Sequence, residues 1–384
     1  MKNVYFILSF VLFLQTACNV GKREKAEQII KNFEAENVPD EREMVFSVHA
    51  QYNHGKLVLK GETSEQELKT HLLALFESLD FADSVAVLPD ASAGEKTFAI
   101  VTVPVANLRG APSYSSELVT QAILGTPVKI LKKEGGWFFI QTPDKYISWV
   151  DQSAIWPVTT SELNEWKKST RIIFTGLNGT IYEDEDLSVP ISDVTLGCIL
   201  TQTAETVRRK EIRFPDGRTG FVAPQKWLDF HTFKTETEAV PENIIALAKQ
   251  LSGRSYLWGG TSVNAMDCSG FVKTVFFANG LILARDASLQ ARHGREIQIN
   301  NTQLGDLLFF GRKATETETE RITHVALSTG DSEFIHASGH IRQNSFNPDS
   351  PIYSEYRKNS FVKAMRIIGF EGDGIQHIKN HSWY

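Results

Sequence analysis

The chain has 384 residues, of which 42% are hydrophobic, and a formal net charge of −6 at pH 7. This length suits two to four domains of ordinary size, and the apolar fraction is enough for a sizeable core. The charge is mildly negative and no basic patch is interleaved with aromatic residues, which argues against nucleic acid as a partner. Cys18, Cys198 and Cys268 lie in three different contexts, which argues against a disulfide framework. Cys198 lies in an apolar run and is expected to be a small buried residue.

Residues 1–18 have the pattern of a lipoprotein signal peptide. A basic start precedes an apolar stretch from Val4 to Leu14, and small residues precede Cys18. This order is typical of a secretory signal, and the apolar stretch is short for a membrane span. The residues before Cys18 resemble a bacterial lipoprotein box, although Gln15 holds the place where leucine is usual. We expect Cys18 to be lipidated and to become the N-terminus; the alternative is plain secretion, with Cys18 discarded or left unmodified.

Residues 19–95 are expected to form a small α/β unit with an adaptor or packing role. The predicted order is helix, strand, strand, helix, strand, over residues 24–33, 44–52, 56–60, 63–76 and 84–88. Capping signals in Thr63-Ser-Glu-Gln-Glu67 open the second helix. The predicted apolar face of that helix holds Leu68, Leu72, Leu73, Leu75 and Phe76.

Two all-β domains are predicted next, over residues 98–160 and 168–232. In the first, short strands alternate with turn signals such as Leu124-Gly-Thr-Pro127, and Tyr146-Ile-Ser-Trp-Val150 resembles a motif of the bacterial SH3-like barrel. The second is a more diverged copy, in which Leu196-Gly-Cys-Ile199 echoes the turn of the first. A polar helix over residues 161–169 would link the two barrels.

Residues 240–384 carry the residues that indicate chemistry. Cys268 follows a Trp258-Gly-Gly260 turn and opens a predicted helix. At a helix N-terminus, exposed N–H groups and the macrodipole favour a thiolate, which is the nucleophilic form. His324 and His336 lie on two strand-like runs joined by the turn Thr329-Gly-Asp-Ser332. On antiparallel strands they would lie side by side, one as the base and the other orienting it.

The last domain is therefore expected to be α+β, with the cysteine helix packed on an antiparallel sheet that carries the histidines. Asn243 is expected to cap a helix over residues 244–251. Simpler interpretations remain: Cys268 as a buried structural thiol, and the histidines as a hydrogen-bonded core pair. A further alternative makes Cys268, His324 and His336 the ligands of a catalytic zinc ion.

Six motifs between about residues 243 and 369 resemble the NlpC family of papain-like cell-wall cysteine peptidases. They are Tyr256-Leu-Trp-Gly-Gly260, Asp267-Cys-Ser-Gly-Phe271, Arg285-Asp286, Leu304-Gly-Asp-Leu-Leu-Phe-Phe310, Thr323-His-Val-Ala326 and Phe334-Ile-His-Ala-Ser338. The resemblance implies hydrolysis of the bond between γ-D-glutamate and a diamino acid in peptidoglycan peptides. It makes Cys268 the nucleophile, His324 the base and His336 the orienting residue. It also places Tyr256 beside the nucleophile and Ser269 among the substrate-binding residues.

Members of this family that follow SH3-like domains and trim unattached muropeptides hold the ammonium of the substrate's first residue with acidic residues and a tyrosine. By motif, the corresponding positions are Asp286, Glu117 and Tyr146. The simpler interpretations are a helix cap for Asp286, a solvated loop charge for Glu117 and a barrel-core aromatic for Tyr146. The chain departs from these relatives at Ala287, where serine is usual, although Ser288 is adjacent.

The sequence thus predicts a monomeric cysteine endopeptidase of the cell envelope, without cofactor or metal. Its expected substrates are peptidoglycan stem peptides whose first L-alanine has an unacylated amine, as in cell-wall recycling. Its other expected partner is a membrane, held through a lipid anchor on the periplasmic or surface side. The rival hypothesis is a non-catalytic or lytic protein that binds the cell wall with its SH3-like modules.

Overall fold

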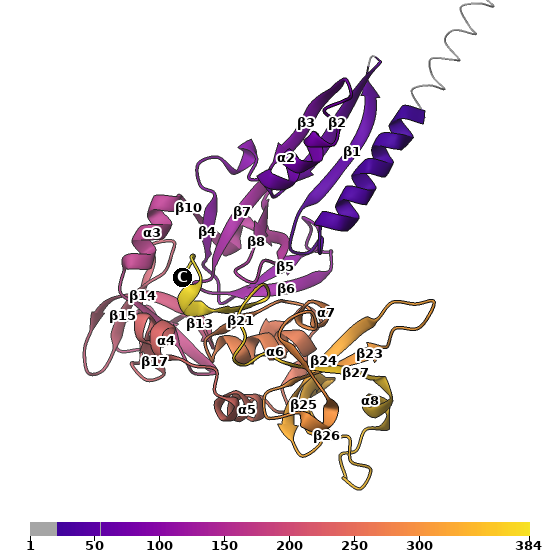
Figure 1. Cartoon of the computed structure of the whole chain (residues 1–384). Helices are drawn as coiled ribbons and strands as arrows, with labels where there is room; N and C mark the ends of the chain where they lie inside the picture. Colours follow the sequence, from indigo (N-terminus) through magenta and orange to yellow (C-terminus); the bar gives the residue numbers. More distant parts are fainter. Residues whose placement is uncertain (1–20, 54) are drawn as a thin grey trace, which may run out of the picture. The chain divides into compact units, whose positions relative to one another are not determined.

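The computed structural model describes residues 21–53 and 55–384, which belong to two compact units divided after Gly94 (Figure 1). The predicted signal peptide and the lipidation site Cys18 lie outside the described residues. Within those residues, every helix is too short or too polar to cross a membrane.

The first unit is a three-stranded sheet with helices. Residues 21–37 are helical. The other elements are β1 (Phe46–Asn53), β2 (Lys56–Thr63), α2 (Gln66–Ala74), β3 (Phe81–Val87) and the 3-10 turn η1 (Ala91–Ala93). β1 and β2 are antiparallel, whereas β3 runs parallel to β2 because α2 carries the chain across between them. The predicted order of elements is confirmed.

Two details of this unit differ from the sequence prediction. The capping signals do not cap α2: its N-cap is Glu65, without a side-chain bond to the helix. Thr63 is the last residue of β2, and the Ser64 hydroxyl accepts from the Val45 N–H instead. Leu68, Leu72 and Phe76 are buried as expected, but Leu75 is 51% exposed. Leu75 is the C-cap residue of α2, so the helix ends before the apolar pattern does.

The two predicted SH3-like regions are seven-stranded antiparallel sheets of the same topology. The first has the order β10-β4-β7-β8-β9-β5-β6 and the second β17-β11-β14-β15-β16-β12-β13. Strands of the first are β4 (Phe98–Val101), β5 (Val105–Arg109), β6 (Leu118–Ile123), β7 (Pro127–Glu134), β8 (Trp137–Gln141), β9 (Ile147–Asp151) and β10 (Ile155–Val158), with the turn η2 (Gln152–Ala154). Strands of the second are β11 (Arg171–Phe174), β12 (Asn178–Tyr182), β13 (Pro190–Thr195), β14 (Ile199–Glu205), β15 (Lys210–Arg213), β16 (Thr219–Val222) and β17 (Trp227–Asp229).

The strand-by-strand match shows that the second region repeats the first. The repeated turn begins with a glycine in the left-handed region in both copies, Gly125 at φ 83° and Gly197 at φ 88°. A side chain would be strained at this φ, which explains why the Leu-Gly pair recurs. Cys198, directly after the second of these glycines, is completely buried, as predicted.

The expected barrels are corrected to open sheets, because no pairing between described residues joins the two edge strands of either order. In the first region, edge strand β6 instead bonds to the last domain. The Gln121 carbonyl accepts from the Thr261 hydroxyl, and the Gln121 side chain accepts from the Thr261 N–H. Helix α3 (Thr160–Lys168), with a capping box from Thr159 and Glu162, links the two regions, as predicted.

The last domain packs helices on a nine-stranded sheet of order β19-β20-β18-β26-β25-β24-β23-β27-β22. Its strands are β18 (Ser255–Tyr256), β19 (Thr261–Ser262), β20 (Ala265–Met266), β22 (Arg295–Ile297), β23 (Leu307–Arg312), β24 (Arg321–Gly330), β25 (Glu333–Ser338), β26 (His340–Ser345) and β27 (Phe361–Arg366). A separate pair joins β21 (Leu281–Leu283) to β28 (Ile375–His377). The helices are α4 (Phe230–Glu236), α5 (Pro241–Gln250), α6 (Cys268–Phe277), α7 (Ala287–Gln290) and α8 (Glu355–Ser360), with turns η3 (Ile299–Asn301) and η4 (Ile378–Asn380).

The predicted α+β arrangement is confirmed, since α6 packs on the antiparallel strands β24 and β25. The predicted cap of α5 is wrong: the N-cap is Val240, and Asn243 lies inside the helix. Pro241 occupies the first turn, where its fixed φ suits the helix and its missing N–H costs nothing.

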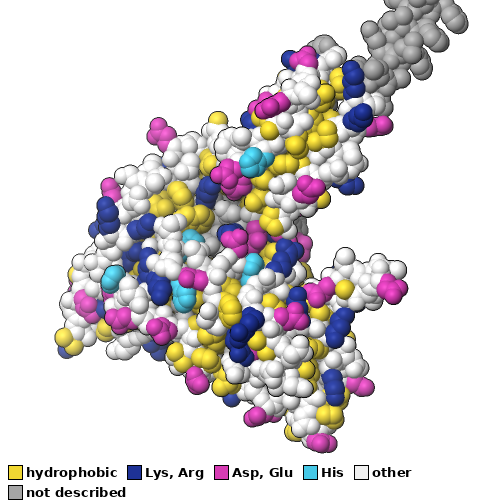
Figure 2. Space-filling view, viewed as in Figure 1, with side chains coloured by type: hydrophobic (Ala, Val, Ile, Leu, Met, Phe, Trp, Pro, Cys, Tyr) yellow, Lys and Arg dark blue, Asp and Glu magenta, His cyan; other side chains and the backbone are white. Residues whose placement is uncertain are grey.

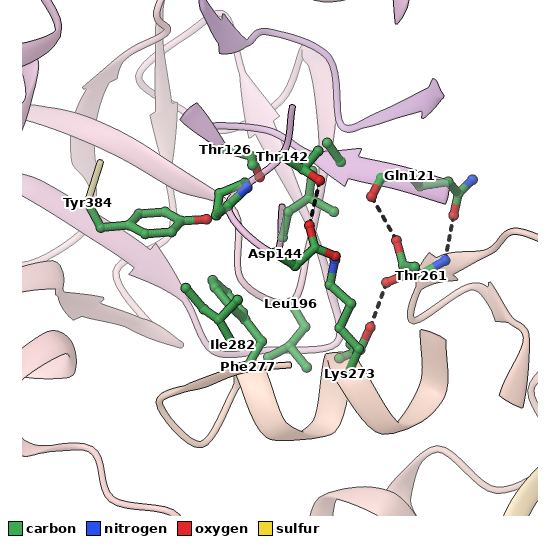
Figure 3. A pocket seen from close by; sticks show the side chains of 14 residues that line it. Gln121, Thr126, Thr142, Asp144, Leu196, Thr261, Lys273, Phe277, Ile282 and Tyr384 are labelled. Atoms are coloured by element: carbon green, nitrogen blue, oxygen red, sulfur yellow. Dashed lines mark hydrogen bonds and ion pairs between the residues drawn. The ribbon is translucent and has the colours of Figure 1, made fainter. Parts of the chain in front are cut away.

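The first SH3-like sheet and the last domain share a buried polar junction, shown in Figure 3. Asp144 forms an ion pair with Lys273 of α6, and its side chain is only 1% exposed. Burial alone would raise the pKa of Asp144, but the Lys273 ammonium and the Thr142 hydroxyl lower it below its usual value. The two domains are thereby held in a fixed relation around α6.

Lys273→Met should destabilise the protein strongly, because it leaves Asp144 buried without its counter-charge. We expect the free energy of unfolding in urea to fall by about 3–5 kcal/mol. The matched control is Asp373→Ala, which breaks a second ion pair between these two domains, Lys145–Asp373. The side chains of that pair are 52% and 89% exposed, so its loss should cost at most about 1 kcal/mol. Equal losses in the two variants would contradict the buried junction.

Candidate active site

Cys268 is the first residue of α6, as predicted, and its side chain is buried against β24. Asp267 caps the helix by accepting from the Gly270 N–H at 2.7 Å. Burial, and then the Asp267 carboxylate, raise the pKa of the Cys268 thiol to about 11; the N–H groups of Val325 and Ser269 and the Arg285 charge lower it by less. The helix start therefore does not produce a resting thiolate, because desolvation outweighs it. The thiol must lose its proton during the reaction.

The two histidines lie on neighbouring antiparallel strands, as predicted. Leu327 of β24 faces Ile335 of β25, so His324 and His336 are diagonal neighbours on one face of the sheet. The His324 Nε2 and His336 Nδ1 atoms are 2.7 Å apart, and His336 Nε2 is 2.9 Å from the Asn344 Oδ1 atom. Both rings are buried.

The hydrogen-bond partners determine the tautomers of His324 and His336. The Asn344 amide donates to the Ile352 carbonyl at 2.9 Å, which turns its oxygen toward His336. His336 must then carry its proton on Nε2 and accept at Nδ1. His324 consequently donates from Nε2, which leaves Nδ1 as its basic nitrogen. His324 directly precedes Val325, whose N–H is close enough to the Cys268 sulfur to lower the pKa of the thiol, so the geometry favours His324 as the base.

Burial keeps both histidines neutral at physiological pH. Burial, and then Arg357 and His336, lower the pKa of His324 well below 6.5. Burial likewise lowers the pKa of His336 to about 4, although the Asn344 hydrogen bond opposes it. A neutral His324 can accept the thiol proton. Once protonated, it is a strong enough acid to pass that proton to a leaving amine.

A buried ion pair between Asp267 and Arg285 holds the loops around the cysteine. Arg285 is 1% exposed and donates to both Asp267 oxygens, at 3.1 and 2.5 Å. It also donates to the Ser269 hydroxyl at 3.0 Å and to the Thr120 hydroxyl of the first SH3-like sheet at 2.9 Å. Asp267 in turn accepts from the Gly259 N–H at 3.0 Å. One pair thus connects the glycine turn, the helix start and a strand of another domain.

Gly259 shows how closely the last domain approaches the first SH3-like sheet. Its φ is +76°, and a Cβ there would lie 2.3 Å from the Leu118 carbonyl oxygen of β6. No side chain fits that space, so the glycine turn before the cysteine also permits the contact between the domains.

The predicted substrate-binding residues of the last domain lie around the cysteine. Tyr256 is half-buried on β18, where burial, and then the Cys268 and Asp267 charges, raise the pKa of its phenol. The Ser269 hydroxyl is committed to Asp267 and Arg285. Asp286 holds the N-cap position of α7 without capping it, and its carboxylate lies 3.9 Å from the Arg285 guanidinium. The structure therefore does not support a capping role for Asp286.

The two predicted residues of the first SH3-like sheet reach the same region. Glu117 is exposed and accepts from the Trp258 indole N–H at 2.6 Å. Tyr146 is 6% exposed and packs on Ala284 and Leu289 of the last domain. It is thus an interface aromatic, not a core residue of its own sheet.

The zinc alternative finds no support in this arrangement. The imidazole nitrogens of His324 and His336 that face each other are hydrogen-bonded together, so they do not converge on a shared ion. In the described part of the chain, no group of three or more His, Cys, Asp or Glu side chains is placed to hold a metal.

The sequence pattern assigned no role in this site to Asn344 or Arg357. It also did not predict that Arg285 is buried. Only Arg285 had a usable signal, because it follows the apolar run Leu281–Ala284 and a charge there implies a buried partner. Asn344 and Arg357 reach the histidines only through the pairing of β25 with β26 and the placement of α8.

A buried cysteine at a helix start and a hydrogen-bonded pair of histidines on neighbouring strands are the arrangement of a papain-like cysteine peptidase. Residues 253–366 match the NlpC/P60 family, and residues 108–155 match the bacterial dipeptidyl-peptidase Sh3 domain. The chain belongs to the NlpC/P60 family of cysteine peptidases, and the predicted resemblance is confirmed.

Three relatives show how far the similarity extends. Dipeptidyl-peptidase 6 of Lysinibacillus sphaericus is 29% identical over 67% of this chain and 94% of the relative. Gamma-D-glutamyl-L-lysine dipeptidyl-peptidase of Bacillus cereus is 24% identical over 63% of this chain and 74% of the relative. A probable endopeptidase of Haemophilus influenzae is 33% identical over 33% of this chain and 79% of the relative.

The raised pKa of Cys268 predicts the pH dependence of its alkylation in the substrate-free protein. We expect iodoacetamide to react slowly at pH 7 and the rate to rise about tenfold per pH unit, without a plateau below about pH 10. Peptide mapping distinguishes Cys268 from the more deeply buried Cys198, and Cys268→Ala provides the blank. A plateau between pH 6 and 7 would instead indicate a preformed thiolate.

Proposed function

We propose that this protein is a cysteine endopeptidase that hydrolyses the bond between γ-D-glutamate and a diamino acid, in peptidoglycan-derived peptides whose first L-alanine has an unacylated amine. The observation that carries this proposal is the position of Glu117. It comes from the SH3-like sheet, yet it bonds to Trp258 in the loop that leads to Cys268. The names of the Lysinibacillus and Bacillus relatives agree with such a substrate.

The proposed mechanism uses the hydrogen-bond chain behind His324. Its Nδ1 takes the thiol proton as Cys268 attacks the γ-carbonyl of D-glutamate. The Gly270 N–H at the start of α6 is taken by the Asp267 cap, so the Cys268 N–H is the donor that stabilises the oxyanion. The imidazolium then gives its proton to the leaving amine of the diamino acid. Water attacks the resulting thioester, and the dipeptide leaves with a new carboxylate.

Glu117 and Asp286 supply the proposed selectivity for an unacylated amine. The two carboxylates come from different domains, and both flank the loops that are tied together by Arg285. An alanine ammonium would bond to both, whereas an acylated nitrogen carries no charge and leaves both carboxylates without that partner. A stem peptide still attached to its sugar should therefore be a poor substrate, which favours recycling or scavenging over wall lysis.

The test compares L-Ala-γ-D-Glu-L-Lys with and without an acetyl group on the alanine amine. We expect acetylation to lower kcat/KM by about tenfold or more. Glu117→Ala combined with Asp286→Ala should abolish this preference, whereas Glu211→Ala, on β15 of the second SH3-like sheet, should retain it. Cys268→Ala should cleave neither peptide. Equal rates on both peptides would refute the amine clamp, and turnover by Cys268→Ala would refute the mechanism.

We further propose that the protein acts at the cell envelope, anchored through a lipid on Cys18. The support is the order of basic, apolar and small residues over positions 1–18. Mass spectrometry of the protein isolated from its native membrane fraction should find Cys18 as the N-terminal residue, carrying a diacylglyceryl mass. An unmodified N-terminus at another residue would show that the anchor is absent.

A further inference from the structure

Arg357 is a cation next to the catalytic histidines that the mechanism above does not use. It is half-buried on α8, and its guanidinium lies 5.4 Å from the centre of the Phe310 ring. That ring is 5.7 Å from the ring of His324. On another side, Arg357 donates to the Ser338 hydroxyl at 3.3 Å, two residues after His336. Arg357 is therefore one aromatic ring away from the base.

The surroundings of Arg357 provide no counter-charge. Among residues 21–53 and 55–384, no carboxylate forms an ion pair with it, and its other close contact is the Tyr356 ring at 5.2 Å. Burial lowers the pKa of the guanidinium, and the Arg342 charge acts in the same direction. A partly buried cation held without an anion is costly unless a ligand supplies one.

A pocket opens beside this cation, between the β23–β24 hairpin and α8. Its polar lining comes from Arg312, Arg321, Thr323, Tyr356, Arg357 and Ser360. Arg312 is neutralised by Glu318 at 2.8 Å. Arg321 is exposed and has no ion pair within the described parts of the chain. The pocket therefore presents two uncompensated guanidinium groups, Arg321 and Arg357, next to Thr323, the residue before His324.

The position of the pocket suggests which part of a substrate would reach it. Figure 1 shows α8 well away from β5, β6 and α7, with the β23–β24 strands between. On the face in Figure 2, acidic side chains mark the projecting β23–β24 hairpin. If Glu117 and Asp286 hold the alanine amine, the peptide passes Cys268 with its glutamyl carbonyl and continues toward α8. The residue released there is the diamino acid.

We propose that Arg357, together with Arg321, binds a carboxylate of the leaving diamino acid. This inference rests on the proposed function, because it needs the substrate to run from the SH3-like sheet toward α8. Two carboxylates fit the chemistry. One is the α-carboxylate of the third residue, and the other is a carboxylate at the end of its side chain, as in diaminopimelate. A lysine side chain ends in an ammonium, which the two arginines repel.

The experiment uses the full chain and peptides of the form L-Ala-γ-D-Glu-X. X is lysine amide, with no carboxylate; lysine, with the α-carboxylate; or diaminopimelate α-amide, with only the side-chain carboxylate. We expect Arg357→Gln to lower kcat/KM by about tenfold or more on at least one carboxylate-bearing peptide, and by less than about twofold on lysine amide. The peptide that loses more identifies the carboxylate. Arg357→Lys should recover part of the loss on that peptide.

Arg295→Gln is the matched control, since this arginine lies on β22 at the edge of the same sheet, outside the pocket, and it should change all three rates by less than about twofold. An equal loss on all three peptides would overturn the inference and limit Arg357 to setting the charge around Cys268. A fourth peptide, in which the α-carboxylate of D-glutamate is amidated, tests the other carboxylate of the substrate. If the Arg357 effect disappears on that peptide alone, the inference is also overturned. A wild-type enzyme that cleaves none of the peptides would overturn the proposed function itself, and this inference with it.

Discussion

The active site depends on the buried ion pair between Asp267 and Arg285. Removing either partner would leave a charge in the interior, so both must be present for the loops to form. Burial lowers the pKa of Arg285, but the two oxygens of Asp267 hold it above its usual value. Because Asp267 also caps α6 and fixes the Gly259 N–H, the same carboxylate sets both the direction of the helix and the position of the sulfur.

The Asp267 carboxylate also disfavours the thiolate form of Cys268. It lies next to Cys268 in sequence and, after burial, is the main contributor to the raised pKa of the thiol. The resting site therefore holds a neutral thiol and neutral imidazoles, with their protons positioned by Asn344 and, behind it, the Ile352 carbonyl. Charge is therefore created during the reaction, among buried groups where preorganised N–H donors act most strongly.

The sequence was sufficient for the features that depend on local pattern. The cysteine at a helix start, the histidines on neighbouring strands and the repeated SH3-like region all follow from short motifs and periodicity. Features set by distant pairing were not accessible. Asn344 meets His336 only through the pairing of β25 with β26, and α8 brings Arg357 to Phe310. A local signal was overlooked at α5, where Pro241 suits the first helical turn and moves the start of the helix ahead of Asn243. The open sheets depend on distant pairing: edge strand β6 bonds to Thr261 of the last domain and not to β10.

The bonds from Thr120, Gln121 and Asp144 into the last domain bear on how such chains can be recombined. A domain that is joined through a linker alone could be exchanged freely. The first SH3-like domain instead contributes a buried hydrogen bond to the arginine that organises the nucleophile loop. The unit that can be inherited or transplanted as a whole is therefore the pair of domains, and a graft of residues 240–384 alone would leave Arg285 without its Thr120 acceptor.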